Sequence, residues 1–111
     1  MSNGFQTLIY PVKEVAAAKQ LYGKLLGTEP YADEPYYVGF RVGGQEIGLD
    51  PHGHRDGPVA YVHVGDVAAT VRMLLDSGAS NHQDVRDVGG GRLIALLKDP
   101  DGNVIGLIQD P

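Results

Sequence analysis

The spacing of apolar residues predicts a strand followed by an amphipathic helix near the start of the chain. Residues 5–10 are rich in the aromatic and β-branched residues typical of strands. In residues 14–26, apolar side chains recur every three or four positions, as on one face of a helix. These apolar residues are Val15, Ala18, Tyr22, Leu25 and Leu26. Gly27 predicts the helix end, because glycine readily takes the left-handed conformation that closes many helices.

The same order of elements returns in the second half of the chain. Residues 59–64 predict a strand, and Asp66 is suited to cap the N-terminus of a helix. The apolar stripe of this second helix is Val67, Val71, Leu74 and Leu75, and Ser77-Gly78 predicts its end. Each helix is followed by strand-like segments: residues 28–32, 36–42 and 45–50 in the first half, and residues 80–88, 92–98 and 104–109 in the second.

A shared tripeptide indicates an internal duplication. Ile47-Gly48-Leu49 and Ile105-Gly106-Leu107 are identical, and each follows a turn rich in residues that tolerate positive φ. Together with the repeated order of elements, this predicts a tandem repeat. The expected fold is α+β, with two βαβββ modules in a single domain of residues 1–111. The first module covers about residues 4–50, a polar linker covers 51–57, and the second module covers about 58–110.

Composition and charge narrow the possible functions. Hydrophobic residues make up 42% and charged residues 21% of the 111-residue chain, as in ordinary globular proteins. The absence of cysteine excludes disulfides, thiolate metal ligands and a cysteine nucleophile. The net charge is −5 and the basic residues are scattered, so we expect no nucleic-acid partner. No apolar run approaches the roughly 20 residues of a membrane span, and residues 1–10 do not resemble a signal peptide, so we expect a cytoplasmic protein without a membrane partner.

These features resemble a known superfamily. The paired modules, the Val-x-Asp/Glu sequence that opens each helix, and the turn Asp99-Pro100-Asp101-Gly102-Asn103 are similar to those of vicinal oxygen chelate proteins. That superfamily comprises glyoxalases, bleomycin resistance proteins and dioxygenases. The resemblance covers nearly the whole chain and implies curved mixed sheets around a cavity. Enzymes of the superfamily hold a divalent metal in that cavity, whereas its bleomycin-binding members use the cavity without one.

The resemblance also locates the positions at which the enzymes carry metal ligands. They fall at Thr7, Gly48, Val59 and Gly106. Divalent metals of this kind prefer imidazole, carboxylate or thiolate ligands, and only Thr7 offers a donor, a weak hydroxyl. We therefore predict no metal and no other cofactor, and we expect standard metal-dependent glyoxalase or dioxygenase activity to be missing. Glycine at two of the positions further predicts open space where a carboxylate would stand.

Side chains alternate between the two faces of a strand, so residues two positions from each metal position should line the same site. Ile47, Leu49 and Val62 are expected to face the helices, so residues of the opposite parity should face the cavity. The predicted ligand-binding residues are Thr7, Ile9, Glu46, Gly48, Asp50, Val59, Tyr61, His63, Gly106 and Ile108. His63 is either a general base or ligand donor, or a histidine hydrogen-bonded at the rim. Tyr61 is either a binding residue or a packing aromatic.

Three other patterns have competing interpretations. Asp50, His52 and His54 could hold a displaced metal, but an exposed linker is the favoured interpretation. The glycine run at residues 89–91 is not followed by a helix, so it predicts a hairpin or bulge rather than a phosphate loop. Tyr36, Tyr37 and Phe40 either form an aromatic wall or belong to the core.

The expected function is metal-independent binding of a small molecule in the cavity between the modules. One alternative is a lyase, isomerase or dioxygenase of the same superfamily with a non-standard active site, in which Glu46, Asp50, Tyr61 and His63 would supply acid-base groups. The other is a non-catalytic interaction module. We leave the catalytic residues unassigned. We also expect a homodimer, because sheet edges with few charged guards invite association with a second copy.

Overall fold

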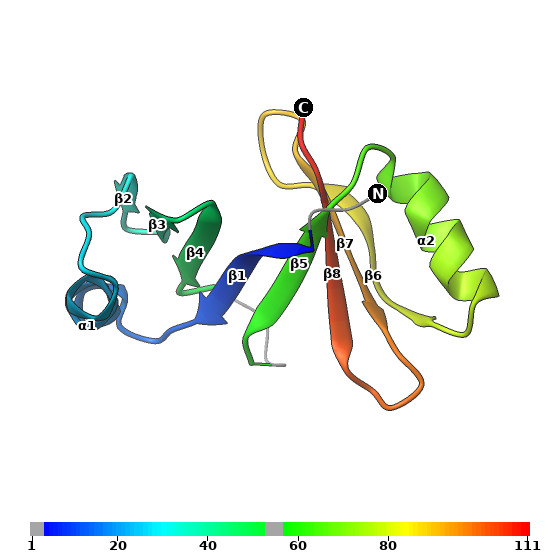
Figure 1. The fold of residues 1–111 in the computed structure, drawn as a ribbon, viewed down its shortest axis with the longest axis horizontal. Coiled ribbons are helices and arrows are strands. Elements are labelled where there is room, and N and C mark those ends of the chain that lie inside the picture. Colours follow the sequence, from blue (N-terminus) through cyan, green and yellow to red (C-terminus); the bar gives the residue numbers. More distant parts are fainter. Residues whose placement is uncertain (1–3, 53–56) are drawn as a thin grey trace. The chain divides into compact units, whose positions relative to one another are not determined.

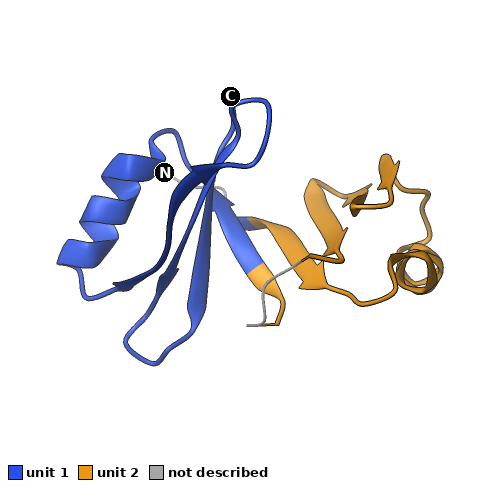
Figure 2. Ribbon diagram, turned by 180° about the vertical axis from the view of Figure 1, so that it is seen from behind, with its two compact units in different colours: residues 1–5, 60–111 blue, residues 6–59 orange. Residues whose placement is uncertain are grey.

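The chain runs twice through the order β-α-β-β-β (Figure 1). The computed structural model describes residues 4–52 and 57–111. The backbone divides into two units, named as in Figure 2: unit 2 is residues 6–59, and unit 1 is residues 60–111 together with residues 4 and 5. The predicted α+β fold with tandem βαβββ modules is confirmed.

Unit 2 is a four-stranded sheet with one helix. Its elements are β1 (Phe5–Pro11), α1 (Val15–Leu26), β2 (Ala32–Glu34), β3 (Tyr37–Val42) and β4 (Gln45–Asp50). The strand order is β2-β3-β4-β1, with β1 parallel to β4 and the other pairs antiparallel. Helix α1 covers one face of this sheet, where Val15, Ala18, Tyr22 and Leu26 pack against alternate strand residues. Leu25, which the helical spacing placed in the same apolar stripe, is exposed instead. The buried strand residues of this core are Val38, Phe40, Ile47 and Leu49.

Unit 1 repeats this arrangement. Its elements are β5 (Val59–His63), α2 (Val67–Asp76), β6 (Ser80–Asp87), β7 (Leu93–Lys98) and β8 (Val104–Gln109). The strand order is β5-β8-β7-β6, with β5 parallel to β8. Helix α2 packs on one face, where Val67, Ala95, Leu97 and Leu107 are buried. Neither helix in the described part of the chain is long and apolar enough to cross a membrane.

The predicted helix ends are confirmed. Gly27 has φ 69° and its N–H donates to the Gly23 carbonyl, so it closes α1 in the left-handed conformation. Asp66 caps α2 by accepting the N–H of Ala69 at 3.0 Å. The side chain of Gln109 accepts the N–H of Val67 at 2.9 Å, which ties the start of α2 to the end of β8.

The turns have the conformations that their glycine and aspartate residues favour. Gly43 and Gly44 join β3 to β4 with positive φ, as two-residue hairpins require. In the turn before β8, the Asp99 carboxylate accepts the side-chain amide of Asn103 and the N–H groups of Asn103 and Asp101. These hydrogen bonds, led by that of the Asn103 side chain, hold the pKa of Asp99 below its ordinary value.

The glycine run forms a hairpin, as predicted. Residues 89–91 all have positive φ, and the strand β7 follows them. The loop is closed by the N–H of Val88, which donates to the Arg92 carbonyl at 2.9 Å. No helix N-terminus follows this loop, so the phosphate-loop interpretation is excluded.

One expectation for unit 2 is wrong. Residues 28–32 were expected to be a strand, but β2 begins only at Ala32, because Pro30 has no N–H to donate to a sheet. Pairing starts at Tyr31, whose N–H donates to the Gly39 carbonyl. Of the two interpretations of the aromatic residues in this hairpin, membership of the core is confirmed for Phe40, which is buried under α1, whereas Tyr36 is 63% exposed.

Candidate functional site

The sheet face opposite α1 carries the predicted polar residues of unit 2. Because Ile47 and Leu49 belong to the core under α1, their neighbours Glu46, Gly48 and Asp50 lie on the other face. The parallel register of β1 and β4 places Thr7 beside Glu46 and Ile9 beside Gly48. The predicted parity of these strands is confirmed.

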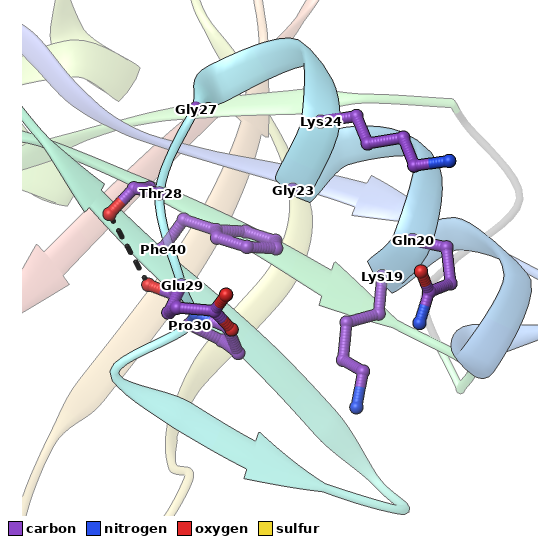
Figure 3. Close-up of a pocket in the computed structure, with 9 residues that line it drawn as sticks. All are labelled: Lys19, Gln20, Gly23, Lys24, Gly27, Thr28, Glu29, Pro30 and Phe40. Carbon is purple, nitrogen blue, oxygen red and sulfur yellow. Dashed lines mark hydrogen bonds between the residues drawn. The ribbon is translucent and has the colours of Figure 1, made fainter.

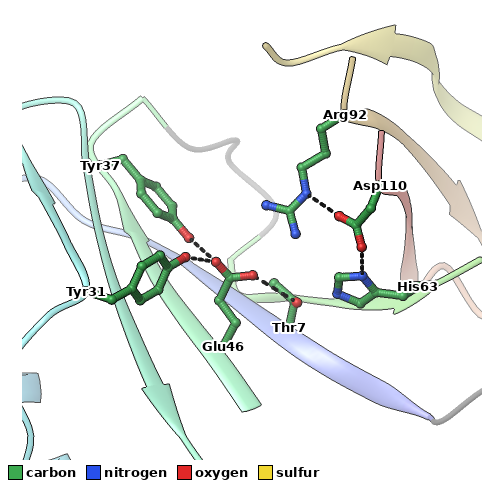
Figure 4. A network of polar contacts seen from close by, with 7 residues as sticks. All are labelled: Thr7, Tyr31, Tyr37, Glu46, His63, Arg92 and Asp110. Carbon is green, nitrogen blue, oxygen red and sulfur yellow. Dashed lines mark hydrogen bonds and ion pairs between the residues drawn. The ribbon is translucent and has the colours of Figure 1, made fainter. Parts of the chain in front are cut away.

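The Glu46 carboxylate gathers three hydroxyl groups (Figure 4). Tyr31 donates its hydroxyl to Oε2 of Glu46, and Tyr37 approaches the same oxygen at 3.5 Å. Thr7, which is buried, donates to Oε1 at 3.4 Å. The contacts of Tyr37 and Thr7 are long and contribute weakly. We call Thr7, Tyr31, Tyr37 and Glu46 the Glu46 cluster.

The two tyrosines of this cluster lie over glycines. Gly39 and Gly48 are directly opposite each other in the antiparallel register of β3 and β4. A methyl group added at Gly39 would lie 2.8 Å from Cζ of Tyr31. One added at Gly48 would collide with the Tyr37 hydroxyl and would lie 2.6 Å from Cδ1 of Ile9. The expectation of open space at Gly48 is therefore wrong, because neighbouring side chains fill it.

Arg41 completes the surroundings of Tyr31. Its guanidinium carbon lies 4.0 Å from the centroid of the Tyr31 ring, within the range of a cation–π interaction. Arg41 is directly opposite Glu46 in the register of β3 and β4. Sequence reasoning missed Tyr31 and Arg41, and it named Tyr37 only as a residue of an aromatic wall or of the core. Tyr37 and Arg41 are each two positions from Gly39 along β3, and Gly39 is paired with Gly48. Alternation therefore puts them on the same sheet face as Gly48, and this was the signal that could have found them.

In unit 1, Tyr61 and His63 lie on the sheet face opposite α2. Their neighbours Val62 and Val64 pack in the core with α2, which confirms the predicted parity. The register of β5 and β8 pairs Tyr61 with Gly106 and His63 with Ile108. A methyl group added at Gly106 would lie 2.5 Å from Cδ2 of Tyr61. The expectation of open space is wrong here too, because the Tyr61 ring covers the glycine.

Asp110 joins two basic side chains at the end of β8 (Figure 4). Its Oδ2 lies 3.0 Å from Nδ1 of His63, and its Oδ1 lies 3.2 Å from Nε of Arg92. A carboxylate at Nδ1 favours the tautomer with the proton on Nδ1, which makes Nε2 the basic nitrogen. We call these three residues the Asp110 cluster. Asp110 and Arg92 could not be found from the sequence, because only the folded hairpin brings them to His63.

The remaining predicted residues contribute little chemistry. Val59 and Ile108 are buried apolar side chains. The Asp50 carboxylate accepts the N–H of His52 at 2.8 Å, a local turn contact. His54 lies outside the described residues.

A groove of about 670 Å³ also lies in unit 2, away from every predicted site residue. Figure 3 shows it between the second half of α1 and the segment that leads to β2, with Phe40 at its base. Lys19 at its edge is paired with Asp33 at 3.0 Å. The groove is open and is lined mostly by polar or charged residues, among them Gln20, Lys24 and Glu29. Small-molecule sites are mostly apolar, so the groove is a weaker candidate than the two clusters.

Comparison with known proteins decides the family. A sequence model of the Glyoxalase/Bleomycin resistance protein/Dioxygenase superfamily matches residues 4–107. The chain belongs to this superfamily. A search among curated protein sequences gave no significant match.

Solved structures share the fold. A protein described as an NAD-dependent benzaldehyde dehydrogenase from Legionella pneumophila is 22% identical, with a TM-score of 0.78 over 95% of this chain and 98% of that one. Methylmalonyl-CoA epimerase from Mycobacterium tuberculosis is 18% identical, with a TM-score of 0.72 over 99% and 89%. A superfamily member from Vibrio splendidus 12B01 is 13% identical, with a TM-score of 0.69 over 94% and 97%. At these identities, the likeness establishes the fold alone.

The residues at the superfamily's metal positions do not fit a divalent metal. Gly48 and Gly106 have no side-chain donor and are covered by Tyr37 and Tyr61, and Val59 is a buried hydrocarbon. The Thr7 hydroxyl is hydrogen-bonded to Glu46. Within residues 4–52 and 57–111, no three histidine, aspartate or glutamate side chains are grouped as a metal site. The four positions therefore offer no set of ligands for metal-dependent chemistry.

Proposed function

We propose that this superfamily member binds a small organic molecule without a metal ion. The observation that carries the proposal is the same in both units: a metal position holds a glycine, and a tyrosine ring lies over it. Tyr37 lies over Gly48 and Tyr61 lies over Gly106, at positions where the superfamily's enzymes carry carboxylates. The Tyr37 ring is only partly buried and offers contact area to an organic ligand, whereas the buried Tyr61 ring fills the corresponding position in unit 1.

The sheet face of unit 2 opposite α1 supplies the groups that a ligand would need. Ile9 and the rings of Tyr31 and Tyr37 provide apolar surface, and Glu46 provides a charged hydrogen-bond acceptor. Small-molecule sites are mostly apolar with a few polar groups that orient the ligand. This face has that composition, which favours binding of a neutral or amphipathic organic molecule.

An acid-base enzyme is the second candidate, and the Asp110 cluster favours it. The 3.0 Å contact between Nδ1 of His63 and Asp110 is the geometry in which a carboxylate orients a histidine base. Such a site would move a proton on a bound organic molecule without a metal. Binding is the first candidate because Tyr31, Tyr37 and Glu46 present apolar and hydrogen-bonding groups on one sheet face of unit 2. A reaction would also need a group that stabilises the charge left by proton transfer.

Binding should survive complete removal of metal. Protein treated with a strong chelator and dialysed is screened against small aromatic and amphipathic compounds by ligand-observed NMR. We expect binding that Zn²⁺, Ni²⁺, Mn²⁺ or Fe²⁺ neither creates nor strengthens, because the metal positions hold Gly, Gly, Val and a hydrogen-bonded Thr. Elemental analysis should find less than stoichiometric metal.

The same samples distinguish the alternatives. A metal that is bound stoichiometrically at sub-micromolar affinity, or turnover of the glutathione hemithioacetal used by glyoxalases, would contradict the proposal. Conversion of a bound compound to product in the metal-free samples would favour the acid-base enzyme. Addition of metal to the chelated protein is the matched control.

We further propose that the chain forms a homodimer. The outer strands do not support edge pairing, because β2 carries Asp33 and Glu34 and β6 carries charged residues along its exposed length. The support comes instead from α1, where Leu21 is 66% exposed and Leu25, one turn later, is 73% exposed. A second copy would remove this apolar surface from water.

Light scattering at tens of micromolar should give twice the mass of the 11.8 kDa chain. Replacing Leu21 and Leu25 by glutamate should shift the protein to monomer, because like charges would meet at the shared surface. A matched control is Met73→Glu, which changes an exposed apolar residue on α2. A monomeric wild-type protein would refute the dimer.

A further inference from the structure

The Tyr31 side chain is held by groups that suit any phenol. Its hydroxyl donates to Glu46 Oε2. The hydroxyl end of its ring lies over Gly39, where an added methyl group would be 2.8 Å from Cζ and 2.9 Å from the hydroxyl oxygen. The guanidinium of Arg41 lies 4.0 Å from the ring centroid. These contacts involve the phenol group alone and not the rest of the tyrosine residue.

Each of the three groups selects a different property of that ring. The carboxylate accepts a hydroxyl proton, and a hydrogen bond to a charged group is stronger than one between neutral groups. The missing Cβ at Gly39 lets a flat ring approach the backbone of the sheet. The guanidinium favours an electron-rich aromatic face. Together they define a slot for a planar hydroxyaryl group.

Tyr31 is attached to this slot by few contacts of its own. It is 42% exposed and stands in the segment between α1 and β2, directly after Pro30. Its backbone N–H donates to the Gly39 carbonyl at 2.9 Å, and this bond does not depend on where the side chain lies. Exchanging the Tyr31 phenol for the phenol of a ligand would replace one set of contacts by an equivalent set.

The second repeat shows that the slot is not a requirement of the fold. In unit 1 the glycine on β8 also lies on the face opposite the helix, but its partner on β7 is Leu96. The leucine side chain stands where Gly39 leaves room in unit 2. Only the first repeat therefore combines two opposed glycines with a carboxylate and a tyrosine.

We propose that Glu46, Gly39 and Arg41 form a subsite for a hydroxyaryl group, which Tyr31 occupies in the free protein and a phenolic group of the ligand occupies in the complex. The proposal names the ligand class for the small-molecule binding proposed above and rests on that function. The subsite itself can be tested without knowing the ligand, because a small phenol is a sufficient probe.

The test removes the internal phenol and supplies an external one. The variant Tyr31→Ala is titrated with 4-methylphenol and, separately, with toluene, and binding is followed by NMR. We expect the variant to bind 4-methylphenol at least about tenfold more tightly than the wild type does, because the slot is no longer occupied. Toluene should bind the variant about tenfold more weakly than 4-methylphenol, because it cannot donate to Glu46.

Two further variants assign the binding to the slot. Glu46→Gln in the Tyr31→Ala background should weaken 4-methylphenol about tenfold, because the acceptor loses its charge. Gly39→Ala in the same background meets no clash with the absent ring, yet its methyl group should block the slot and abolish binding. Gly65→Ala, which adds a methyl group where no atom lies within 4 Å, is the matched control and should leave binding unchanged.

The outcomes separate this proposal from the proposed function. Equal binding of toluene and 4-methylphenol by folded Tyr31→Ala would overturn the subsite, because the site would then be an apolar cavity that does not recognise the hydroxyl group. Failure of the folded variant to bind 4-methylphenol would overturn it as well. A stoichiometric metal in the wild-type protein would contradict metal-independent binding without bearing on the slot. In the wild type, 4-methylphenol at high concentration should shift the Tyr31 ring signals, and unchanged signals would refute displacement.

Discussion

Replacing Phe40 by alanine should lower the free energy of unfolding by about 3 to 5 kcal/mol, as for other large-to-small changes in a packed core. Phe40 has no exposed surface and packs with Val38, Ile47 and Leu49 under α1. Its ring is also 3.7 Å from the position of a methyl group added at Gly23, so the helix passes close above it. The alanine variant would leave a cavity that α1 and the sheet fill only in part. Urea denaturation followed by circular dichroism measures the change.

Tyr36→Ala is the matched control for this variant. Tyr36 is an aromatic residue four positions earlier, but it is 63% exposed and belongs to no core cluster in the described residues. Its replacement should change the free energy of unfolding by less than about 0.5 kcal/mol, as for most surface substitutions. Similar losses for the two variants would mean that the hairpin uses both rings as one aromatic wall, contrary to the structure.

The fold could be predicted because local pattern and burial agree along most of the chain. Val67, Val71 and Leu74 recur at helical spacing, and each packs in the core of unit 1. The predicted strand at residues 45–50 is observed as β4 (Gln45–Asp50), because a two-glycine turn fixes where it starts. Alternation then placed Glu46 and Ile47 on opposite faces, which the core confirms. These features depend on short-range spacing, which a single sequence contains.

The contents of the site could not be predicted to the same degree. Alternation tells which face a side chain is on but not where its outer atoms go. Tyr61 was expected to line a space vacated at Gly106, but its ring lies over that glycine. The ring is able to do so because the parallel register puts the two residues side by side. A glycine in a strand often marks the close approach of another group, and here that group is a neighbouring ring.

Contacts between side chains of different strands could not be predicted either. Tyr31 meets Glu46 because β2, β3 and β4 are adjacent, and Arg92 meets Asp110 because a hairpin brings the start of β7 to the end of β8. Strand order and register determine both contacts, and neither follows from hydrophobic spacing. Alternation along a strand therefore identifies site residues such as Glu46 and His63, whereas Tyr31, Arg92 and Asp110 reach the site only through the pairing of strands.

Gly106→Leu should lower the free energy of unfolding by about 3 kcal/mol, at the upper end of what overpacking usually costs. Three atoms of the Tyr61 ring lie between 2.5 and 2.8 Å from the position of an added Cβ at Gly106. Both residues are buried, so the ring cannot simply swing into solvent. The backbone conformation is not the cause, because Gly106 does not have positive φ. Urea denaturation of the variant and the wild type gives the difference.

A double-mutant cycle with Tyr61→Ala identifies the ring as the cause. Removing the ring creates a cavity that a leucine at residue 106 can fill, so Tyr61→Ala and Gly106→Leu together should destabilise less than the sum of the two single variants. We expect a coupling free energy of at least about 1 kcal/mol, as for residues in direct contact. Gly65→Leu serves as the control, since nothing lies within 4 Å of an added Cβ there, and it should leave stability nearly unchanged. If Gly106→Leu is as stable as the wild type, the glycine borders open space, and the void expected from the sequence exists after all.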